Sequence, residues 1–312
     1  MKNKQYTQTI LMVEPVAFHY NAQTAVNNYF QQKPENSADE IQALALQEFR
    51  QMVSTLREKG VNVITIKDTP VPHTPDSIFP NNWISFHENG DCVLYPMFAE
   101  NRRQEVREED IFELLESKGF LVNDIIDYTE AAEDNIFLEG TGSIILDREN
   151  KLAYAAISPR TDEDLFIEFC EDLEYTPVYF TAYQTVDNER LPIYHTNVMM
   201  CVADRYAIIC LDSLDDSQEK KHVCDMLTES GKEIISITEE QMHRFAGNML
   251  QVGGLGQAYL VMSQSAFDSL THEQIETIEK YNPIISVNIE TIETLGGGSA
   301  RCMMAEVFLP KK

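Results

Sequence analysis

Residues 52–60, MVSTLREKG, and residues 61–66, VNVITI, contain the structural unit on which this chain is built. Met52, Val53 and Leu56 are spaced as the apolar face of a helix that lies on a sheet. Gly60 supplies the left-handed residue that commonly ends a helix. The β-branched residues that follow favour a strand. This segment therefore predicts an amphipathic helix, a turn and a β-strand.

The same unit occurs five times along the chain. The other copies are residues 111–119 with 120–122, 166–174 with 178–180, 223–231 with 233–237, and 275–282 with 284–287. Glycine, or asparagine in the last copy, is expected in the left-handed conformation, and Glu174 is the exception. The residues at this position, Gly60, Gly119, Glu174, Gly231 and Asn282, are separated by 59, 55, 57 and 51 positions. This period is too long for a helical-hairpin solenoid and fits one helix with about three strands, repeated around an axis.

A short polar or small-residue segment follows each unit after about twenty residues. These segments are residues 79–83, 138–142, 194–197, 246–249 and 298–302. They place Asn82, Glu139, His195, Asn248 and Cys302 at 22, 20, 21, 17 and 20 positions beyond the turn. If five units close around an axis, these side chains converge on one central cavity. The alternative is that any helix–strand alternation gives this pattern and that the polar residues match by chance.

The sequence resembles the pentein superfamily, which includes arginine deiminases, dimethylarginine hydrolases, agmatine deiminases, succinylarginine dihydrolases and amidinotransferases. The similarity runs from Leu11 to Pro310. It is carried by DSIFPNNW (76–83), LEG (138–140), ISPRT (157–161), YHTN (194–197), GNML (247–250) and the glycine-rich approach to Cys302. This combination is most similar to arginine-deiminase-related, citrulline-utilisation hydrolases. The resemblance implies an α/β fold, a five-bladed pseudo-symmetric α/β propeller of ββαβ repeats, as a single catalytic domain over residues 1–312.

The resemblance also implies a cysteine nucleophile, a histidine acid/base and an acidic residue, which fall on Cys302, His195 and Glu139. A guanidine or urea carbon is a poor electrophile, and a thiolate is a nucleophile strong enough to attack it. His195 would protonate the departing amine and then activate water. Glu139 would accept hydrogen bonds from the N–H groups of the substrate. The expected reaction is hydrolysis of a C–N bond through a covalent cysteine intermediate, without a metal or cofactor.

Asn82 and Asn197 stand where many guanidine-binding relatives have carboxylates. A carboxylate pairs with a guanidinium cation, whereas an amide offers one donor group and one acceptor and carries no charge. The two amides therefore favour a neutral ureido group, and we predict the conversion of citrulline to ornithine, ammonia and carbon dioxide. Arginine deiminase, dihydrolase and amidinotransferase activities remain alternatives.

Other residues are assigned to the substrate pocket less specifically. Asn248 is expected there by its offset, and Asp76 either binds substrate or caps its loop. Arg160 either anchors the carboxylate of an amino acid or forms a structural ion pair. Arg301, directly before the nucleophile on an extended segment, should point to the opposite face. Residues 14–36 are expected to form a loop over the mouth of the pocket.

Composition limits the possible partners. The formal charge of −27 argues against nucleic acid and anionic membranes, which carry the same sign of charge. No apolar run approaches the ~20 residues that cross a bilayer, and the polar N-terminus predicts a cytoplasmic protein. We expect a small ureido or guanidino substrate as the partner, and the sequence leaves open whether the chain forms a homo-oligomer. A non-catalytic propeller that binds a macromolecule is the rival class, but it predicts a broken Cys/His/Glu set.

The six cysteines show no pairing that suggests a disulfide or metal site. Cys92, Cys170, Cys201, Cys210 and Cys224 lie in apolar or helical contexts and are expected in the core. Cys302, after a run of three glycines, differs from them.

Overall fold

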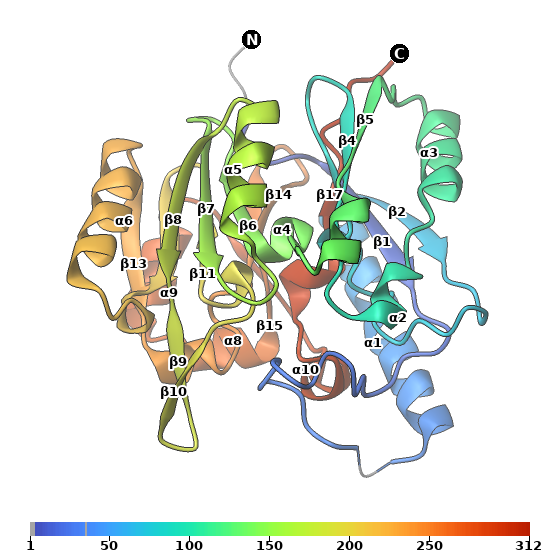
Figure 1. The fold of residues 1–312 in the computed structure, drawn as a ribbon, viewed down its shortest axis with the longest axis horizontal. Helices are drawn as coiled ribbons and strands as arrows, with labels where there is room; N and C mark the ends of the chain where they lie inside the picture. The colour runs from blue at the N-terminus through green and yellow to red at the C-terminus, as the bar shows by residue number, and fades with distance from the viewer. Residues whose placement is uncertain (1–3, 35) are drawn as a thin grey trace.

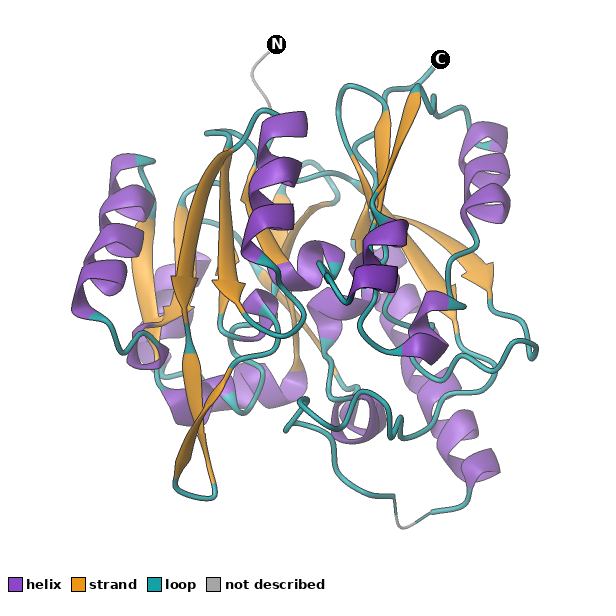
Figure 2. Cartoon of the chain, in the orientation of Figure 1, coloured by secondary structure: helices purple, strands orange, loops and turns teal. Residues whose placement is uncertain are grey.

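The computed structural model describes residues 4–34 and 36–312 (Figures 1 and 2), and within these ranges the strands form five three-stranded sheets and one separate hairpin. In each sheet the middle strand pairs antiparallel with one neighbour and parallel with the other. A helix connects each parallel pair, as such crossovers require. The chain is therefore an α/β protein with several small sheets.

The five sheets follow one another along the chain. The first contains β17 (Ala305–Glu306), β1 (Thr9–Glu14) and β2 (Asn62–Lys67), with α1 (Ala38–Glu58) between the last two. The second contains β3 (Ile84–Phe86), β4 (Asp91–Leu94) and β5 (Asp124–Asp127), with α2 (Glu100–Arg103) and α3 (Glu108–Ser117). The third contains β6 (Ile144–Asp147), β7 (Leu152–Ile157) and β8 (Thr176–Thr181), with α5 (Glu163–Asp172).

The fourth sheet contains β11 (Met200–Val202), β12 (Tyr206–Cys210) and β13 (Glu233–Ile237), with α6 (Ser217–Glu229). The fifth contains β14 (Leu250–Gly253), β15 (Ala258–Ser263) and β16 (Ile284–Val287), with α8 (Gln264–Ser269) and α9 (His272–Glu279). The hairpin of β9 (Tyr183–Val186) and β10 (Glu189–Pro192) precedes the fourth sheet and projects from the body of the molecule (Figure 1). Short helices and 3₁₀ turns connect the sheets: η1 (Pro80–Asn82), η2 (Thr129–Asp134), α4 (Gly140–Ser143), η3 (Thr196–Val198), η4 (Leu211–Ser213), α7 (Glu239–Met242), α10 (Glu290–Gly296) and η5 (Ala300–Met303).

Helix α1 shows how the apolar spacing produces the observed packing. Its buried residues recur every three or four positions: Ile41, Ala45, Phe49, Met52, Val53 and Leu56. This stripe packs against β1, β2 and β16, so the helix covers its sheet as the sequence predicts. Ser37 and Glu40 form a capping box, which satisfies N–H groups of the first turn.

The turns after the helices differ from expectation in two copies. Glu174 is in the left-handed conformation, with φ 57°, like Gly60, Gly119 and Gly231. Asn282 is not among the residues with positive φ. It is buried instead, and its Oδ1 accepts hydrogen bonds from Tyr206 and Gln251. Asn282 therefore contributes through the hydrogen bonds of its side chain and not through a left-handed backbone.

The strand predicted at residues 120–122 is also misplaced, because β5 begins at Asp124. Phe120 instead forms an isolated bridge with Lys311. The first sheet joins both ends of the chain, since Ile10 of β1 pairs with Glu306 of β17. Among the described residues, no helix is long and apolar enough to span a membrane.

The five polar segments predicted from the repeat contact one another in turn. A Cβ at Gly140 would lie 2.4 Å from the backbone oxygen of Asn81, and one at Gly142 would lie 2.8 Å from the ring of His195. A Cβ at Gly247 would lie 2.3 Å from the backbone oxygen of Val198. Asn248 Oδ1 accepts from the Arg301 N–H, and Gly298 packs against Phe79. The last segment thus returns to the first, and all five surround one region of the molecule.

Candidate active site

Cys302 and His195 line one small cavity where these segments meet, together with Asp76, Asn82 and Arg160. Its volume is about 20 Å³, enough for roughly one water molecule. Thr24 and Asn28, from the segment between β1 and α1, also line it. The cavity is therefore small, and part of its wall is formed by the segment between β1 and α1, which we call the covering segment. Glu35, within the predicted range 14–36, lies outside the described residues.

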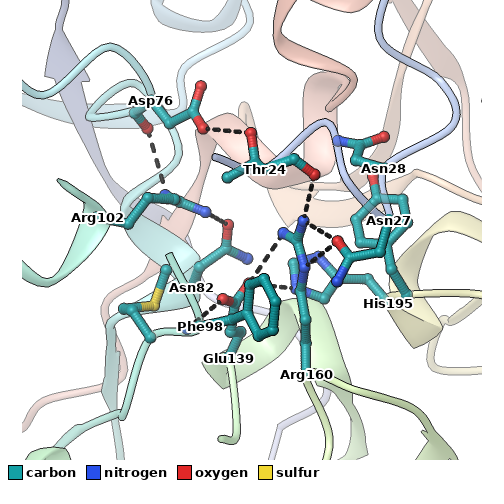
Figure 3. Close-up of polar contacts among 12 residues, drawn as sticks. Thr24, Asn27, Asn28, Asp76, Asn82, Phe98, Arg102, Glu139, Arg160 and His195 are labelled. Atoms are coloured by element: carbon teal, nitrogen blue, oxygen red, sulfur yellow. Dashed lines mark hydrogen bonds and ion pairs between the residues drawn. The ribbon is translucent and has the colours of Figure 1, made fainter. Parts of the chain in front are cut away.

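His195 and Glu139 form a buried hydrogen-bonded pair (Figure 3). His195 Nε2 lies 2.7 Å from Glu139 Oε2, and Arg160 Nη1 lies 3.4 Å from the same oxygen. The other oxygen, Oε1, accepts the N–H of Phe98 at 2.9 Å. Both carboxylate oxygens are thus occupied by protein donors, and Glu139 is not among the residues that line the cavity.

The electrostatics of this pair follow from burial and from Arg160. Burial alone would raise the pKa of Glu139, but the Arg160 guanidinium and the hydrogen bond to His195 hold it well below its usual range. Burial lowers the pKa of His195 to about 4, and Glu139 only partly offsets this effect. At neutral pH the pair therefore consists of a carboxylate and a neutral imidazole, which can accept a proton.

The sulfur of Cys302 has two amide donors. Asn197 Nδ2 lies 3.3 Å and Asn248 Nδ2 lies 3.2 Å from Sγ. Asn248 is fixed because its Nδ2 also donates to the backbone oxygen of Asn197, while its Oδ1 accepts the N–H of Arg301. Two N–H groups directed at one sulfur stabilise negative charge on it.

Asn82 presents its amide nitrogen to the cavity. Its Oδ1 accepts a hydrogen bond of 2.7 Å from Arg102 Nη1, while Nδ2 has no partner among the described residues. Arg102 is itself held by two hydrogen bonds of 2.9 Å to Glu105, and both side chains are buried. Since a guanidinium has only donors, the atom of Asn82 that faces Arg102 must be the oxygen. The wall of the cavity therefore offers a fixed N–H donor.

A family model described as "N,N dimethylarginine dimethylhydrolase, eukaryotic" matches residues 14–309. The chain belongs to this family of the pentein superfamily. The enzyme class predicted from the sequence, a hydrolase of C–N bonds other than peptide bonds, is the class of this family. No curated protein matches the sequence.

Solved structures of penteins share the fold. Unliganded ArgZ, an arginine dihydrolase from the ornithine–ammonia cycle in cyanobacteria, has a TM-score of 0.72 and 18% identity, over 97% of this chain and 41% of ArgZ. The N-terminal domain of ArgZ with bound substrate has a TM-score of 0.70 and 19% identity, over 96% of this chain and 99% of that domain. A dimethylarginine dimethylaminohydrolase variant that carries an S-methyl-L-thiocitrulline adduct has a TM-score of 0.61 and 14% identity, over 96% of this chain and 98% of that enzyme. This pentein thus spans less than half of full-length ArgZ and almost all of its N-terminal domain.

Asp76 and Arg160 of this pentein both contact the covering segment. Asp76 Oδ2 accepts from Asn21 at 2.8 Å and from Thr24 at 3.2 Å, and Oδ1 has no partner among the described residues. Burial raises the pKa of Asp76, and the charge of Arg102 only partly offsets this. Arg160 Nη2 donates to the backbone oxygen of Thr24 at 2.8 Å and to Asn27. The covering segment therefore forms hydrogen bonds with Asp76 and Arg160, two residues that the sequence analysis assigned to substrate binding.

Arg301 points away from the cavity, as predicted, although the reason given was wrong. It lies on η5, not on an extended segment, and its guanidinium donates to Glu306 at 2.7 Å and to the backbone oxygen of Met304.

Four of the five cysteines expected in the core, Cys92, Cys170, Cys201 and Cys210, are buried. Burial raises the pKa of Cys92, Cys170 and Cys201 to about 12, so these thiols stay protonated. Cys224, which was expected in the core, is partly exposed on α6.

Sequence reasoning missed Arg102, Glu105 and Tyr194 at this site. Tyr194 donates from its hydroxyl to the backbone oxygen of Gly297 at 2.7 Å and so fixes the glycine-rich segment before the nucleophile, where Gly297 has φ 63°. Tyr194 stands directly before His195 in a quoted motif, so its position was a usable signal. The signal for Arg102 was weaker: it forms a basic pair with Arg103 in a strongly acidic chain, where such pairs are rare.

Proposed function

We propose that this pentein hydrolyses the ureido C–N bond of a citrulline-type amino acid through a covalent intermediate on Cys302. The observation that carries the proposal is the hydrogen bond from Arg102 to Asn82, which leaves the Asn82 N–H facing the cavity. A guanidinium has only donors and would oppose this N–H, whereas the carbonyl oxygen of a ureido group accepts from it. Asp76 does not present a free carboxylate for a cation, because its Oδ2 already accepts hydrogen bonds from Asn21 and Thr24.

The roles of the three central residues follow from their contacts. Neutral His195 accepts the thiol proton of Cys302, and the thiolate attacks the ureido carbon with the Asn197 and Asn248 amides beside the sulfur. The C–N bond to the side-chain nitrogen breaks, and His195 returns the proton to that nitrogen, which leaves as the amine. Water, deprotonated by His195, then attacks the S-carbamoyl carbon. The thiol is restored, and carbamic acid decomposes to ammonia and carbon dioxide.

Glu139 acts in this scheme as a positioning residue. Its oxygens hold His195, the Phe98 N–H and Arg160, so it orients the imidazole and stabilises the imidazolium that forms in each proton transfer. Arg160 is proposed as the anchor of the substrate carboxylate. Its contacts to Thr24 and Asn27 must then be exchanged for substrate when the covering segment moves.

We further propose that the five sheets form a closed five-bladed propeller that is one catalytic domain. The shared sheet of β1 and β17 and the circular contact of the five polar segments support this arrangement. Closure brings equivalent positions of successive units to one axis.

Arginine dihydrolase activity is the second candidate. ArgZ, whose N-terminal domain has the same fold, is an arginine dihydrolase. A guanidine that is hydrolysed twice passes through a ureido compound, so the ureido step is common to both proposals.

Steady-state assays of citrulline, arginine, agmatine and succinylarginine test the proposal. We expect ornithine and ammonia from citrulline, with a higher kcat/KM than for any of the other three. Turnover of arginine without turnover of citrulline would defeat it. A product that requires an added acceptor amine would instead identify an amidinotransferase.

A further inference from the structure

A second and much larger cavity lies outside the catalytic pocket. Its volume is about 720 Å³, and it opens to solvent between hairpin β9–β10, helices α8 and α10, and the covering segment at Tyr29 and Phe30. Figure 1 shows the hairpin and the two helices along the lower side of the molecule. None of the proposed catalytic residues lines it.

Gln184 of β9 is an unsatisfied amide in the wall of this cavity. Its side chain is 1% exposed, and neither Nε2 nor Oε1 has a hydrogen-bond partner among the described residues. Burial of an amide without partners is unfavourable for folding. A ligand in the cavity can supply the missing partner to Oε1.

The charges and rings around Gln184 define the ligand chemistry. Two exposed carboxylates line the cavity, Asp268 and Glu290, against one guanidinium, Arg244. Burial raises the pKa of a third acid in the lining, Glu293, to about 7. Arg244 is exposed, and its Nε donates to Ser265 at 3.1 Å. Three aromatic side chains complete the lining: Tyr29, Phe30 and Phe245. Carboxylates together with aromatic rings are the groups that bind organic cations.

One residue in the lining of this cavity, Phe245, has a strained backbone conformation. Phe245 has φ 62°, a conformation that is costly for a bulky residue, and its ring lies 5.1 Å from that of Phe30. The inner carboxylate, Glu293, accepts a hydrogen bond of 2.5 Å from Ser299, three residues before Cys302. The cavity therefore adjoins the segment that carries the nucleophile while remaining a separate space.

We infer that this cavity is a binding site for a small organic amine in its cationic form, held by Gln184, the carboxylates of Asp268 and Glu290, and the aromatic rings. The amine that ureido or guanidino hydrolysis releases belongs to this class of ligand. The site itself does not depend on which substrate the catalytic pocket accepts.

Isothermal titration calorimetry with putrescine tests the inference. Two ligands of the same chain length serve as controls, neutral 1,4-butanediol and anionic succinate. We expect one putrescine per chain and no heat from either control. Binding of butanediol as tight as that of putrescine, binding of succinate alone, or no binding of putrescine would each overturn the inference.

Variants locate the site. Gln184→Leu and Glu290→Gln should each weaken putrescine binding by about tenfold or more. Glu240→Gln, an equal charge change at an exposed position off the cavity, should leave the affinity unchanged, as should Asn82→Ala in the catalytic pocket. Loss of binding in Asn82→Ala but not in Glu290→Gln would place putrescine in the catalytic pocket and overturn the inference.

The melting temperature separates a binding role from a structural one. Because Gln184→Leu removes an unsatisfied buried amide, it should raise Tm by about 2–4 °C while it weakens binding. A lower Tm would mean that the amide supports the fold, and the inference would fail.

Discussion

Arg102 donates a 2.7 Å hydrogen bond to Asn82 and thereby decides which end of the Asn82 amide faces the catalytic cavity. The two residues are twenty positions apart, one on helix α2 and the other on the 3₁₀ turn η1. Arg102 is in turn fixed by Glu105. The buried ion pair of Arg102 and Glu105 thus determines that Asn82 offers a hydrogen-bond donor, and not an acceptor, at the cavity wall.

Asn82→Asp should invert the substrate preference. The aspartate keeps one oxygen on Arg102 and turns the other, an acceptor, toward the cavity. We expect the ratio of kcat/KM for citrulline to that for arginine to fall by about tenfold or more, which corresponds to about 1.4 kcal/mol. Paired assays of both substrates measure the ratio, and Asn81→Asp is the neighbouring control. An unchanged ratio would show that Asn82 does not determine the preference between the two substrates.

Cys302→Ser should abolish turnover, with a loss in kcat of about 10³-fold or more, because a hydroxyl is a far weaker nucleophile here than a thiolate. Cys210→Ser, in the core, should keep activity if it folds, as circular dichroism can check. Mass spectrometry after a haloacetamidine, and separately a ureido analogue, should find the adduct on Cys302 only. Equal labelling of Cys224, the partly exposed thiol, would argue that Cys302 is not activated.

Gly142→Ala should impair catalysis while the chain still folds. An added Cβ would lie 2.4 Å from Asn82 Nδ2 and 2.8 Å from the His195 ring, so both side chains must move. We expect kcat to fall by about tenfold or more, since small misplacements of catalytic groups are costly. Urea unfolding should show a loss of stability of about 1–3 kcal/mol, which leaves the chain folded under assay conditions. Full activity would mean that these contacts are not needed in their observed positions.

The stability should depend on pH through His195. Its pKa is about 4 in the folded chain, below the ordinary value of 6.5, so the unfolded chain binds the proton more readily. The contribution of neutral His195 is therefore complete above about pH 6.5 and is lost as the pH falls toward 4. Relative to His195→Gln, the wild type should lose up to about 1.4 kcal/mol per pH unit in that window. Parallel stability curves for the two proteins would contradict the buried neutral imidazole.

Arg102→Met should destabilise the chain by about 3–5 kcal/mol, because Glu105 is left buried without its partner. The double variant Arg102→Met with Glu105→Leu should recover much of this loss, since no buried charge remains. Denaturant unfolding of the two variants measures the difference. A double variant as unstable as the single one would show that the pair contributes through packing instead of charge.

The helices could be predicted from the sequence, whereas the polar contacts of the site could not. Helix α1 was predictable because its apolar spacing is local, and the offsets from each helix end placed Cys302, His195 and Asn82 at one cavity. The roles assigned to these residues stay predictions. Strand β5 was misplaced because Phe120 is apolar for its packing in the core beside α3 and not for a place in the sheet.

The sequence alone determined the fivefold repeat, the α/β class and the residue types at the site, because each depends on spacing along the chain. Tertiary structure decided that Glu139 turns to His195 and that Asn82 offers its N–H to the cavity. It also decided that the covering segment holds Arg160. The physical reason is that an amide or carboxylate has several faces, and only the partners brought beside it by folding determine which face is left for a ligand.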